Sequence, residues 1–383
     1  MTTTEPSPST APVPPSALAL RASPVAGVAF LMFMIGGLAS SSWLAWHQHV
    51  ELLPPTLTTE AILEGDVTHR IARELSKAPL PVGAANLERG ASWLLLEDSG
   101  PRVRKGCPGW LFLTDELKLN RHAEKNANAK ADAVIRLNRQ LATRGITLLV
   151  SVVPDKSRIA TSALCDLHRP PVLQQRLRQW TVALQAAGVA ALDLTSALQP
   201  LGEQAFLRTD THWSEPGARA AAQAVAAQVR NMGLQASPRK RFTVDSPEAR
   251  PRAGDLVRLA GLDWLPQTLK PPGEQTVQSV ISEAPATPNE EADSLDDLFG
   301  DANLPNTALI GTSFSRNSNF AGFLEATLGA SIGNFAKDGG EFSGAAKAYF
   351  ASPAYLQTPP KVLIWEIPER ELQTPYAGDL PVR

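Results

Sequence analysis

The sequence predicts an α/β fold in which a parallel β-sheet is covered by helices on both faces. Two observations predict it. Between residues 130 and 230, helical stripes of apolar side chains alternate with short, unbroken apolar runs, and the same alternation returns after residue 306. Strands that are apolar along their whole length are typical of parallel sheets, because both faces of such sheets are buried. The chain has 383 residues, which is long enough to bury a sizeable core.

The predicted elements follow from the spacing of apolar residues and from the glycines and prolines that end each run. Gly145 and Gly188 close two of the helices, and Ser214 stands where it would cap a third. The predicted helices cover residues 130–144, 173–187, 215–229 and 320–328, with a further helix at 59–76. The predicted strands are Ile146 to Val153, Val189 to Leu194, Thr307 to Ile310 and Lys361 to Ile367.

A membrane-targeting segment lies near the N-terminus. No charged residue occurs between Ala22 and Val50, and the apolar stretch between them is about 20 residues long, enough to cross a bilayer. Arg21 precedes this stretch and acidic residues follow it, so the N-terminus is expected in the cytoplasm. We expect a cytoplasmic tail at 1–22, an inner-membrane signal anchor at 23–46 and a stalk at 47–58. A cleaved signal peptide is the alternative, although the apolar run is longer than the hydrophobic part of most signal peptides.

The rest of the chain is predicted to form one exported domain at 59–375, followed by a tail at 376–383. An irregular insertion at about 237–305 interrupts the helix-strand rhythm with several prolines and an acidic run. Seven carboxylates and no Lys or Arg occur between Glu283 and Asp301. Their spacing fits no calcium-binding loop, so a solvated insertion is favoured over a calcium site.

Charge and cysteine content exclude two classes of protein. The chain has 36 Lys and Arg against 38 Asp and Glu, so it lacks the basic footprint of a nucleic-acid binder. Six His and two Cys cannot build a Cys-rich metal framework, and we expect no metal site and no cofactor. Export makes a disulfide between Cys107 and Cys165 the favoured state, with two separate thiols as the alternative.

Ser313 is the candidate nucleophile. It follows a predicted strand and precedes a helix, which places its hydroxyl at the carboxyl edge of the sheet, where open α/β sheets bind ligands. Backbone N–H groups at such a turn can also stabilise an oxyanion. Ser315 is a competing hydroxyl two positions further on.

A serine nucleophile needs a base, and the base needs a carboxylate to orient it. Asp210 and His212 supply both within three residues, and in an extended segment side chains at i and i+2 would share one side. The sequence contains two competing pairs, Asp166 with His168 and Asp66 with His69. Position favours Asp210 and His212, which lie directly before a well-capped helix.

Five stretches in the same order resemble the alginate O-acetyltransferase family, the SGNH-hydrolase-like proteins of the AlgJ and AlgX type. Their strength lies in the ordered combination over about residues 60 to 370. The stretches are Gly109 to Leu117, Val153 to Lys156, Arg208 to Trp213 with Gly217 and Ala218, Gly311 to Ser315, and Pro359 to Arg370. With its anchor, and with no separate carbohydrate-binding module visible after Arg370, the sequence resembles the membrane-tethered AlgJ form more closely.

The resemblance implies a permuted, flavodoxin-like SGNH domain in which the Asp-x-His pair precedes the serine. It implies periplasmic transfer of acetyl groups to hydroxyls of an exopolysaccharide, alginate or similar. Ser313 would be the nucleophile, His212 the base and Asp210 its orienter, in a ping-pong reaction. It also implies a membrane-bound O-acyltransferase-type partner as the acetyl donor.

Further residues are candidates for oxyanion or substrate contacts, each with a structural alternative. Asn334 and the backbone of Gly339 and Gly340 could donate to the oxyanion or could be turn residues. Lys156 and Arg316 could hold a sugar or carboxylate, or be solvated. Trp213 could stack on a sugar, although the core is favoured. A carbohydrate acetylesterase with the same triad and a non-catalytic envelope scaffold that binds polysaccharide remain alternative functions.

Overall fold

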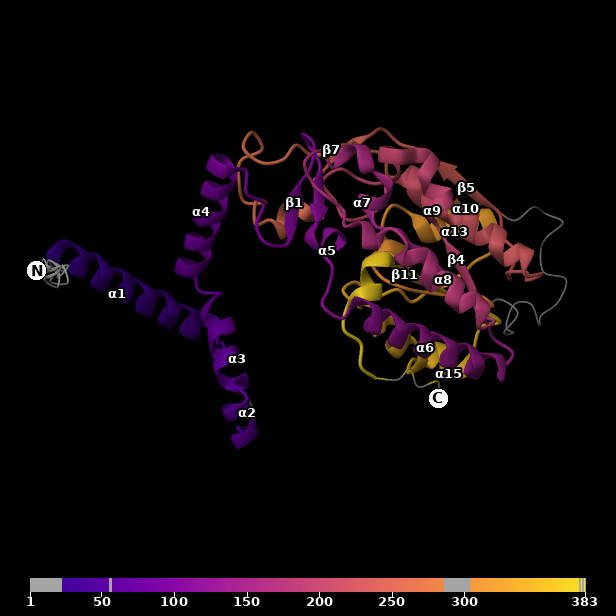
Figure 1. The fold of residues 1–383 in the computed structure, drawn as a ribbon, viewed down its shortest axis with the longest axis horizontal. Coiled ribbons are helices and arrows are strands. Elements are labelled where there is room, and N and C mark those ends of the chain that lie inside the picture. Colours follow the sequence, from indigo (N-terminus) through magenta and orange to yellow (C-terminus); the bar gives the residue numbers. More distant parts are fainter. Residues whose placement is uncertain (1–22, 55–56, 286–303, 379, 381, 383) are drawn as a thin grey trace, which may run out of the picture. The chain divides into compact units, whose positions relative to one another are not determined.

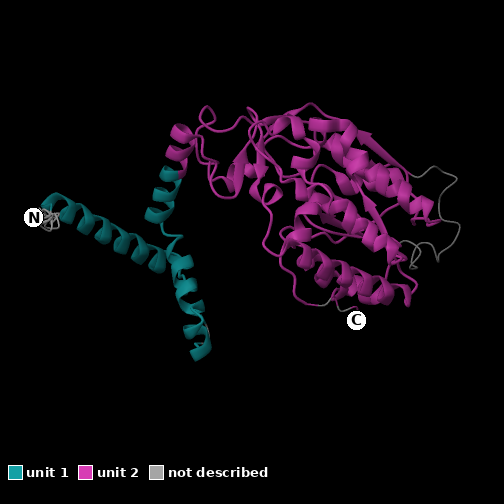
Figure 2. Cartoon of the chain, in the orientation of Figure 1, with its two compact units in different colours: residues 1–88 teal, residues 89–383 magenta. Residues whose placement is uncertain are grey.

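The computed structural model describes residues 23–54, 57–285, 304–378, 380 and 382. The chain divides into two units, residues 1–88 and 89–383 (Figure 2). The expected tail at 1–22 and most of the acidic run at 283–301 lie outside the described residues. The expected domain boundary at residue 59 falls inside the first unit.

The first unit is helical. It contains α1 (Pro24–His47), α2 (Thr59–Leu63) and α3 (Asp66–Leu75), and α4 (Pro79–Leu96) includes the boundary between the units. Among the described helices, α1 alone is long and apolar enough to cross a bilayer, with a mean hydropathy of 1.8. Its 24 residues span about 36 Å, so it is compatible with a single-pass anchor.

The single helix expected at 59–76 is wrong. The chain forms two helices there, separated at Gly65, whose φ of 84° is left-handed. An α-helix cannot continue through a residue in this conformation, and glycine adopts it without steric cost.

The second unit is built on a five-stranded, fully parallel sheet, which confirms the predicted α/β fold (Figure 1). The strand order is β10-β9-β11-β3-β4, so the last long strand in the chain lies at the centre. The strands are β3 (Thr147–Val153), β4 (Ala190–Asp193), β9 (Thr307–Ile310), β10 (Gly333–Asn334) and β11 (Val362–Pro368). The four long strands were predicted, whereas β10 has only two residues and gave no apolar signal.

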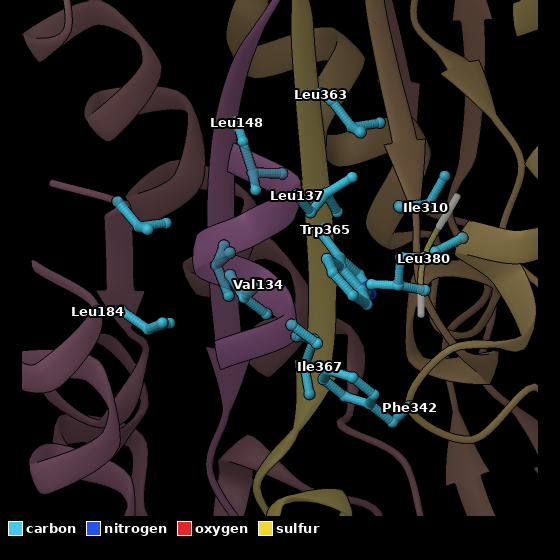
Figure 3. Packing of buried hydrophobic residues seen from close by; sticks show 14 of the residues in the cluster. Val134, Leu137, Leu148, Leu184, Ile310, Phe342, Leu363, Trp365, Ile367 and Leu380 are labelled. Carbon is cyan, nitrogen blue, oxygen red and sulfur yellow. The ribbon is translucent and has the colours of Figure 1, made fainter. Parts of the chain in front are cut away.

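Helices cover both faces of the sheet. One face packs against α6 (Ala123–Ala142), α8 (Arg176–Ala186), α14 (Gly344–Phe350) and α15 (Pro353–Gln357). The other packs against α9 (Thr195–Leu198), α10 (Glu215–Asn231) and α13 (Phe320–Leu328). The side chains of β11 alternate between these layers: Leu363, Trp365 and Ile367 face the α6 layer, and Val362 and Ile364 face the α10 layer. Figure 3 shows Trp365 with Val134, Leu137 and Leu148 in the first layer.

Short elements surround the carboxyl edge of the sheet. A hairpin of β1 (Val103–Lys105) and β2 (Leu111–Leu113) is followed by α5 (Thr114–Leu117), and α7 (Lys156–Ile159) directly follows β3. The region expected as an irregular insertion contains ordered elements in its described part. These are two antiparallel strand pairs, β5 (Phe242–Asp245) with β8 (Val280–Glu283) and β6 (Arg250–Arg252) with β7 (Glu274–Thr276), and the helix α11 (Asp255–Leu259).

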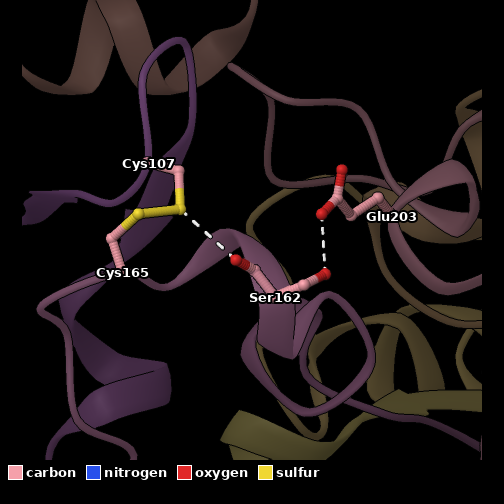
Figure 4. Close-up of a disulfide and its surroundings, with 4 residues drawn as sticks. All are labelled: Cys107, Ser162, Cys165 and Glu203. Carbon is pink, nitrogen blue, oxygen red and sulfur yellow. Dashed lines mark hydrogen bonds between the residues drawn. A yellow bond between two sulfur atoms is a disulfide. The ribbon is translucent and has the colours of Figure 1, made fainter.

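The expected disulfide is present between Cys107 and Cys165, with Cα atoms 5.1 Å apart (Figure 4). It joins the β1–β2 hairpin to the loop that follows α7. The backbone reinforces this junction, because the Cys107 N–H donates to the Ala163 carbonyl at 2.9 Å. Beside it, the Ser162 hydroxyl donates to a Glu203 carboxylate oxygen at 2.6 Å.

Replacing both cysteines with alanine is expected to lower the free energy of unfolding by about 4 kcal/mol, because the bridge closes a loop between residues 58 positions apart. Chemical denaturation of the oxidised wild type and the double variant measures the difference. Reduction of the wild type should reproduce the loss and should not affect the variant. Equal stabilities of the oxidised wild type and the variant would contradict a stabilising role.

Candidate active site

The candidate nucleophile lies on a tight turn at the carboxyl end of β9. Ser313 begins a short 3-10 helix (Ser313–Arg316), and the residue before it caps this helix, since the Thr312 hydroxyl accepts from the Phe314 N–H at 3.3 Å. Ser313 is half-buried, whereas Ser315 is fully buried and donates to Glu366 at 3.0 Å. The competing hydroxyl therefore points into the protein, and Ser313 is the one that faces the surface cavity.

A buried carboxylate on β11 holds the backbone of this turn. Glu366 accepts from the Thr312 N–H at 2.7 Å and from the Thr312 hydroxyl as well as from Ser315. Burial raises the pKa of Glu366, and these hydrogen bonds oppose the rise. A Cβ at Gly311 would lie 2.5 Å from a Glu366 oxygen, so only glycine lets the chain approach this closely.

The Asp-x-His segment is a bend, so its side chains are not brought together by an extended conformation. Its ends are joined by a backbone bond from the Leu207 N–H to the His212 carbonyl at 3.1 Å. The Asp210 carboxylate accepts from the His212 N–H two residues later at 2.9 Å, which is the bond of an Asx-turn. The turn brings the carboxylate and the imidazole together without requiring alternation along a strand.

The three predicted catalytic side chains are connected in the expected order. Asp210 Oδ1 lies 2.6 Å from His212 Nδ1, and His212 Nε2 lies 2.7 Å from Ser313 Oγ. Asp210 and His212 are 2% and 6% exposed. Burial opposes ionisation of Asp210, but hydrogen bonds and charge from His212, together with the charge of Arg252, hold its pKa well below the usual range. An ionised Asp210 favours the tautomer with the proton on Nδ1, which leaves Nε2 to accept the serine proton.

Aromatic rings fix the position of the imidazole. Phe314 meets the His212 ring edge-to-face at a centroid distance of 5.1 Å, and it meets Trp213 at 5.0 Å. Trp213 is fully buried and donates from its indole N–H to the Asn317 carbonyl at 3.3 Å. Trp213 is therefore a core residue, as the sequence favoured, and does not stack on a sugar.

The candidate role of Lys156 in holding substrate is wrong, because its side chain is 1% exposed. Its ammonium group donates to the carbonyls of Leu111, Arg208 and Asp210 at 2.6, 2.8 and 3.1 Å. Burial lowers the pKa of Lys156 to about 8, which leaves it mainly charged at neutral pH. Lys156 thus links β2 to the bend that contains Asp210.

The other candidates separate into turn residues and cavity residues. Asn334 donates to the Ser315 carbonyl at 3.2 Å, and the Gly340 N–H donates to the Lys337 carbonyl at 3.1 Å, so both have structural partners. Gly339 lines the same cavity as Ser313. Arg316 lies in a neighbouring cavity, 3.8 Å from an Asp338 carboxylate oxygen.

The catalytic cavity has a volume of about 520 Å³ and contains Ser313, His212 and Asp210 in its wall. Arg252 and Asn317 line both this cavity and the one that contains Arg316. That second cavity in turn shares Leu207, Glu215, Thr276, Val277 and Ser279 with a third, of about 670 Å³. Through these shared residues the three cavities adjoin one another beside Ser313.

Sequence reasoning missed Arg252, Asp255 and Asn317. The only local sign of a role for Asn317 was its position four residues after Ser313. Arg252 and Asp255 lie in the insertion, far from the catalytic residues in the sequence. Asp210, His212 and Asp255 have ligand atoms within 4.8 Å of one another, as a metal site would require. Both carboxylates already accept hydrogen bonds in this structure. Asp255 accepts from the N–H and the hydroxyl of Thr211, and Asp210 accepts from His212. The arrangement therefore fits the hydrogen-bonded triad of Asp210, His212 and Ser313.

Replacing Lys156 with methionine is expected to lower both stability and activity. Loss of the ammonium group leaves the Leu111 and Asp210 carbonyls without this donor, at a cost of at least about 2 kcal/mol of unfolding free energy. Displacement of Asp210 should also reduce the turnover of the folded fraction.

Lys130→Met is the matched control, since the ammonium of Lys130 is also buried and bonds the carbonyls of Glu371 and Thr374. It should lower stability alone. Denaturation curves together with aryl-ester turnover per folded molecule distinguish the variants. Unchanged turnover in Lys156→Met would contradict the role given to this lysine.

Comparison with known proteins identifies the family of this domain. Residues 103–369 match the family model described as "SGNH hydrolase-like domain, acetyltransferase AlgX". "Probable alginate O-acetylase AlgJ" of Pseudomonas aeruginosa is 34% identical over 326 residues, which cover 83% of this chain and 82% of that protein. The same-named protein of Pseudomonas putida is 31% identical over 359 residues, 92% of this chain and 90% of that one.

Among solved structures, the "O-Acetyltransferase Domain of Pseudomonas putida AlgJ" superposes with a TM-score of 0.61 at 28% identity, over 73% of this chain and 94% of that chain. The fold, the ordered blocks and the match over most of the sequence lead to one conclusion. The chain belongs to the AlgX family of SGNH hydrolase-like acetyltransferase domains.

Proposed function

We propose that this protein is a periplasmic O-acetyltransferase that transfers acetyl groups to hydroxyls of an exopolysaccharide, alginate or similar. The observation that carries the proposal is the continuous hydrogen-bonded path from Asp210 through His212 to Ser313, which opens onto a surface cavity. The names of the AlgJ relatives support acetyl transfer to alginate.

In the first half-reaction, Ser313 Oγ attacks the carbonyl carbon of an acetyl ester or thioester. His212 Nε2, 2.7 Å away, takes the serine proton. The carbonyl oxygen becomes an oxyanion, for which the N–H groups of Ser313 and Gly339 are the proposed donors. Collapse of this intermediate breaks the bond to the leaving group, which receives the proton from His212, and leaves an acetyl group on Ser313.

In the second half-reaction, a sugar hydroxyl attacks the acetyl-serine. His212 takes the hydroxyl proton, the tetrahedral intermediate forms at the same carbon, and the Ser313 oxygen leaves with that proton. The acetyl group is now an ester of the sugar and the enzyme has returned to its starting state. The two steps share one base and one oxyanion site, which gives ping-pong kinetics.

The proposal includes a location and a donor. The apolar helix α1 would act as a single-pass inner-membrane anchor with the catalytic unit in the periplasm, and the disulfide supports an oxidising compartment. From the resemblance to the alginate O-acetyltransferase family, we propose a membrane-bound O-acyltransferase-type partner as the source of acetyl groups.

The experiment uses the full chain purified in detergent, 4-nitrophenyl acetate as donor and an alginate oligosaccharide as acceptor. The wild type should form acetyl-Ser313 and then acetylated oligosaccharide, both detectable by mass spectrometry. Ser313→Ala should form neither, with a loss of at least about 10⁴-fold in rate, because the variant lacks the oxygen that attacks the donor and carries the acetyl group.

Ser315→Ala is the matched control, since it removes a nearby hydroxyl that faces Glu366. It should keep activity within about tenfold of the wild type, because it removes one supporting hydrogen bond of about 1 kcal/mol. Transfer that survives in Ser313→Ala would overturn the mechanism. Release of acetate with no acetylated oligosaccharide would identify an acetylesterase instead.

A further inference from the structure

We propose that Arg252 is a positioning residue for the triad, because its guanidinium group closes a ring of hydrogen bonds that passes through Asp210, His212 and Ser313. The inference rests on the proposed function, since it concerns the same three side chains. The insertion at 237–305 was expected to be solvated. Through Arg252 it instead takes a direct part in shaping the active site.

The ring can be followed atom by atom. From Ser313 Oγ it runs to His212 Nε2 and from His212 Nδ1 to Asp210 Oδ1. Arg252 Nη2 donates to the other carboxylate oxygen, Asp210 Oδ2, at 3.3 Å and to Asn317 Oδ1 at 3.1 Å. Asn317 Nδ2 then donates to the carbonyl oxygen of Ser313 at 2.9 Å. Arg252 therefore joins the carboxylate that orients the base to the backbone of the nucleophile.

The ring constrains geometry that the triad alone leaves free. The two bonds of His212 fix the imidazole relative to one oxygen of Asp210 and to the serine hydroxyl. They do not fix the second oxygen of Asp210 or the peptide that carries Ser313. Arg252 bonds the second oxygen of Asp210 directly, and it holds the Ser313 peptide through Asn317. Arg252 therefore opposes both rotation of the carboxylate and displacement of the turn that carries Ser313.

The segment after Arg252 is fitted closely against the Asp-x-His bend. A Cβ at Gly254 would lie 1.9 Å from the Thr209 carbonyl oxygen, so the backbones touch at a distance that only glycine permits. The Leu256 N–H donates to that carbonyl at 3.2 Å, and the Asp255 N–H donates to Asp210 Oδ2 at 3.2 Å. Contacts of the three residues from Gly254 to Leu256 with Thr209 and Asp210 thus fix the backbone that follows Arg252.

Arg252 also lines the catalytic cavity, so a role in binding substrate is the alternative to a role in positioning. The two roles predict different kinetics. A residue that only binds the polymer raises KM for the polymer and leaves the reaction of a small acetyl ester unchanged. A positioning residue lowers kcat for every donor, including one too small to reach the neighbouring cavities.

The test measures hydrolysis of 4-nitrophenyl acetate by the full chain and its variants. Arg252→Gln should lower kcat about 10²-fold with KM within about threefold of the wild type, because small displacements of reacting groups have effects of this size. Arg252→Lys, which can still donate to both Asp210 and Asn317, should recover about tenfold of that loss. Arg250→Gln, an exposed arginine two positions earlier on β6, should match the wild type.

A second variant keeps the test decisive if Arg252→Gln does not fold. Asn317→Ala breaks the ring at its other side and should lower kcat in the same way. Combining Asn317→Ala with Arg252→Lys should cost less than the product of the two single losses, since Asn317→Ala already opens the ring that Arg252→Lys only weakens. Wild-type kcat in folded Arg252→Gln, or in Asn317→Ala where the former does not fold, would overturn the inference, as would independent, multiplicative effects.

Failure of the inference is distinguishable from failure of the proposed function. If Ser313→Ala is inactive and folded Arg252→Gln hydrolyses the aryl ester at the wild-type rate, the mechanism stands and the positioning role falls. If Ser313→Ala remains active, the proposed function itself falls.

Discussion

Lys156 carries a positive charge into the interior, and the three carbonyl oxygens around it come from segments that are far apart in the chain. Leu111 begins β2, while Arg208 and Asp210 belong to the catalytic bend. A buried ammonium without such partners would cost several kcal/mol, so the segments must meet around it for the charge to be tolerated. The loop that precedes β2 contains Cys107, so the disulfide with Cys165 further restrains the segment that Lys156 holds.

Other buried charges stiffen the same edge of the sheet. Glu369, just after β11, pairs with Arg158 at 2.6 Å and with Arg169 at 2.8 Å. Burial opposes its ionisation, but the bond from Arg158 and the charges of the neighbouring arginines lower the pKa of Glu369 to about 2. Asp155 shares Arg169 with Glu369 and also pairs with Arg176 at 2.7 Å, and its pKa is raised to about 7 by burial and by the nearness of Glu369. Such networks are costly to bury but allow few alternative arrangements. They lie just after β3 and β11, at the edge of the sheet where Ser313 follows β9.

The sequence was sufficient for the features that are encoded locally. The four long strands are mainly apolar, and Asp210, His212 and Ser313 could be selected because each lies in a short, recognisable context. Arg252 could not be found in this way, since its partners Asp210 and Asn317 are 42 and 65 positions away. The role of Lys156 depends on burial, which no local pattern around it indicates. The Asx-turn at Asp210 could not be read from the sequence, because the Asp-x-His spacing is compatible with an extended segment as well as with a turn.

The two ends of the insertion meet at one place in the fold. The Ser237 N–H donates to the Asn306 side chain, and the Asn306 N–H donates back to the Ser237 carbonyl, both at 2.9 Å. The chain therefore leaves the sheet and returns to it through a closed neck, while the part in between reaches the catalytic cavity with Arg252 and Asp255. Because loop length affects stability only weakly, such a segment can vary in length between its packed elements without disturbing β9. Residues 252–257, which contact Asp210, Asn317 and Thr209, are the part that must keep its structure for the triad to stay in place.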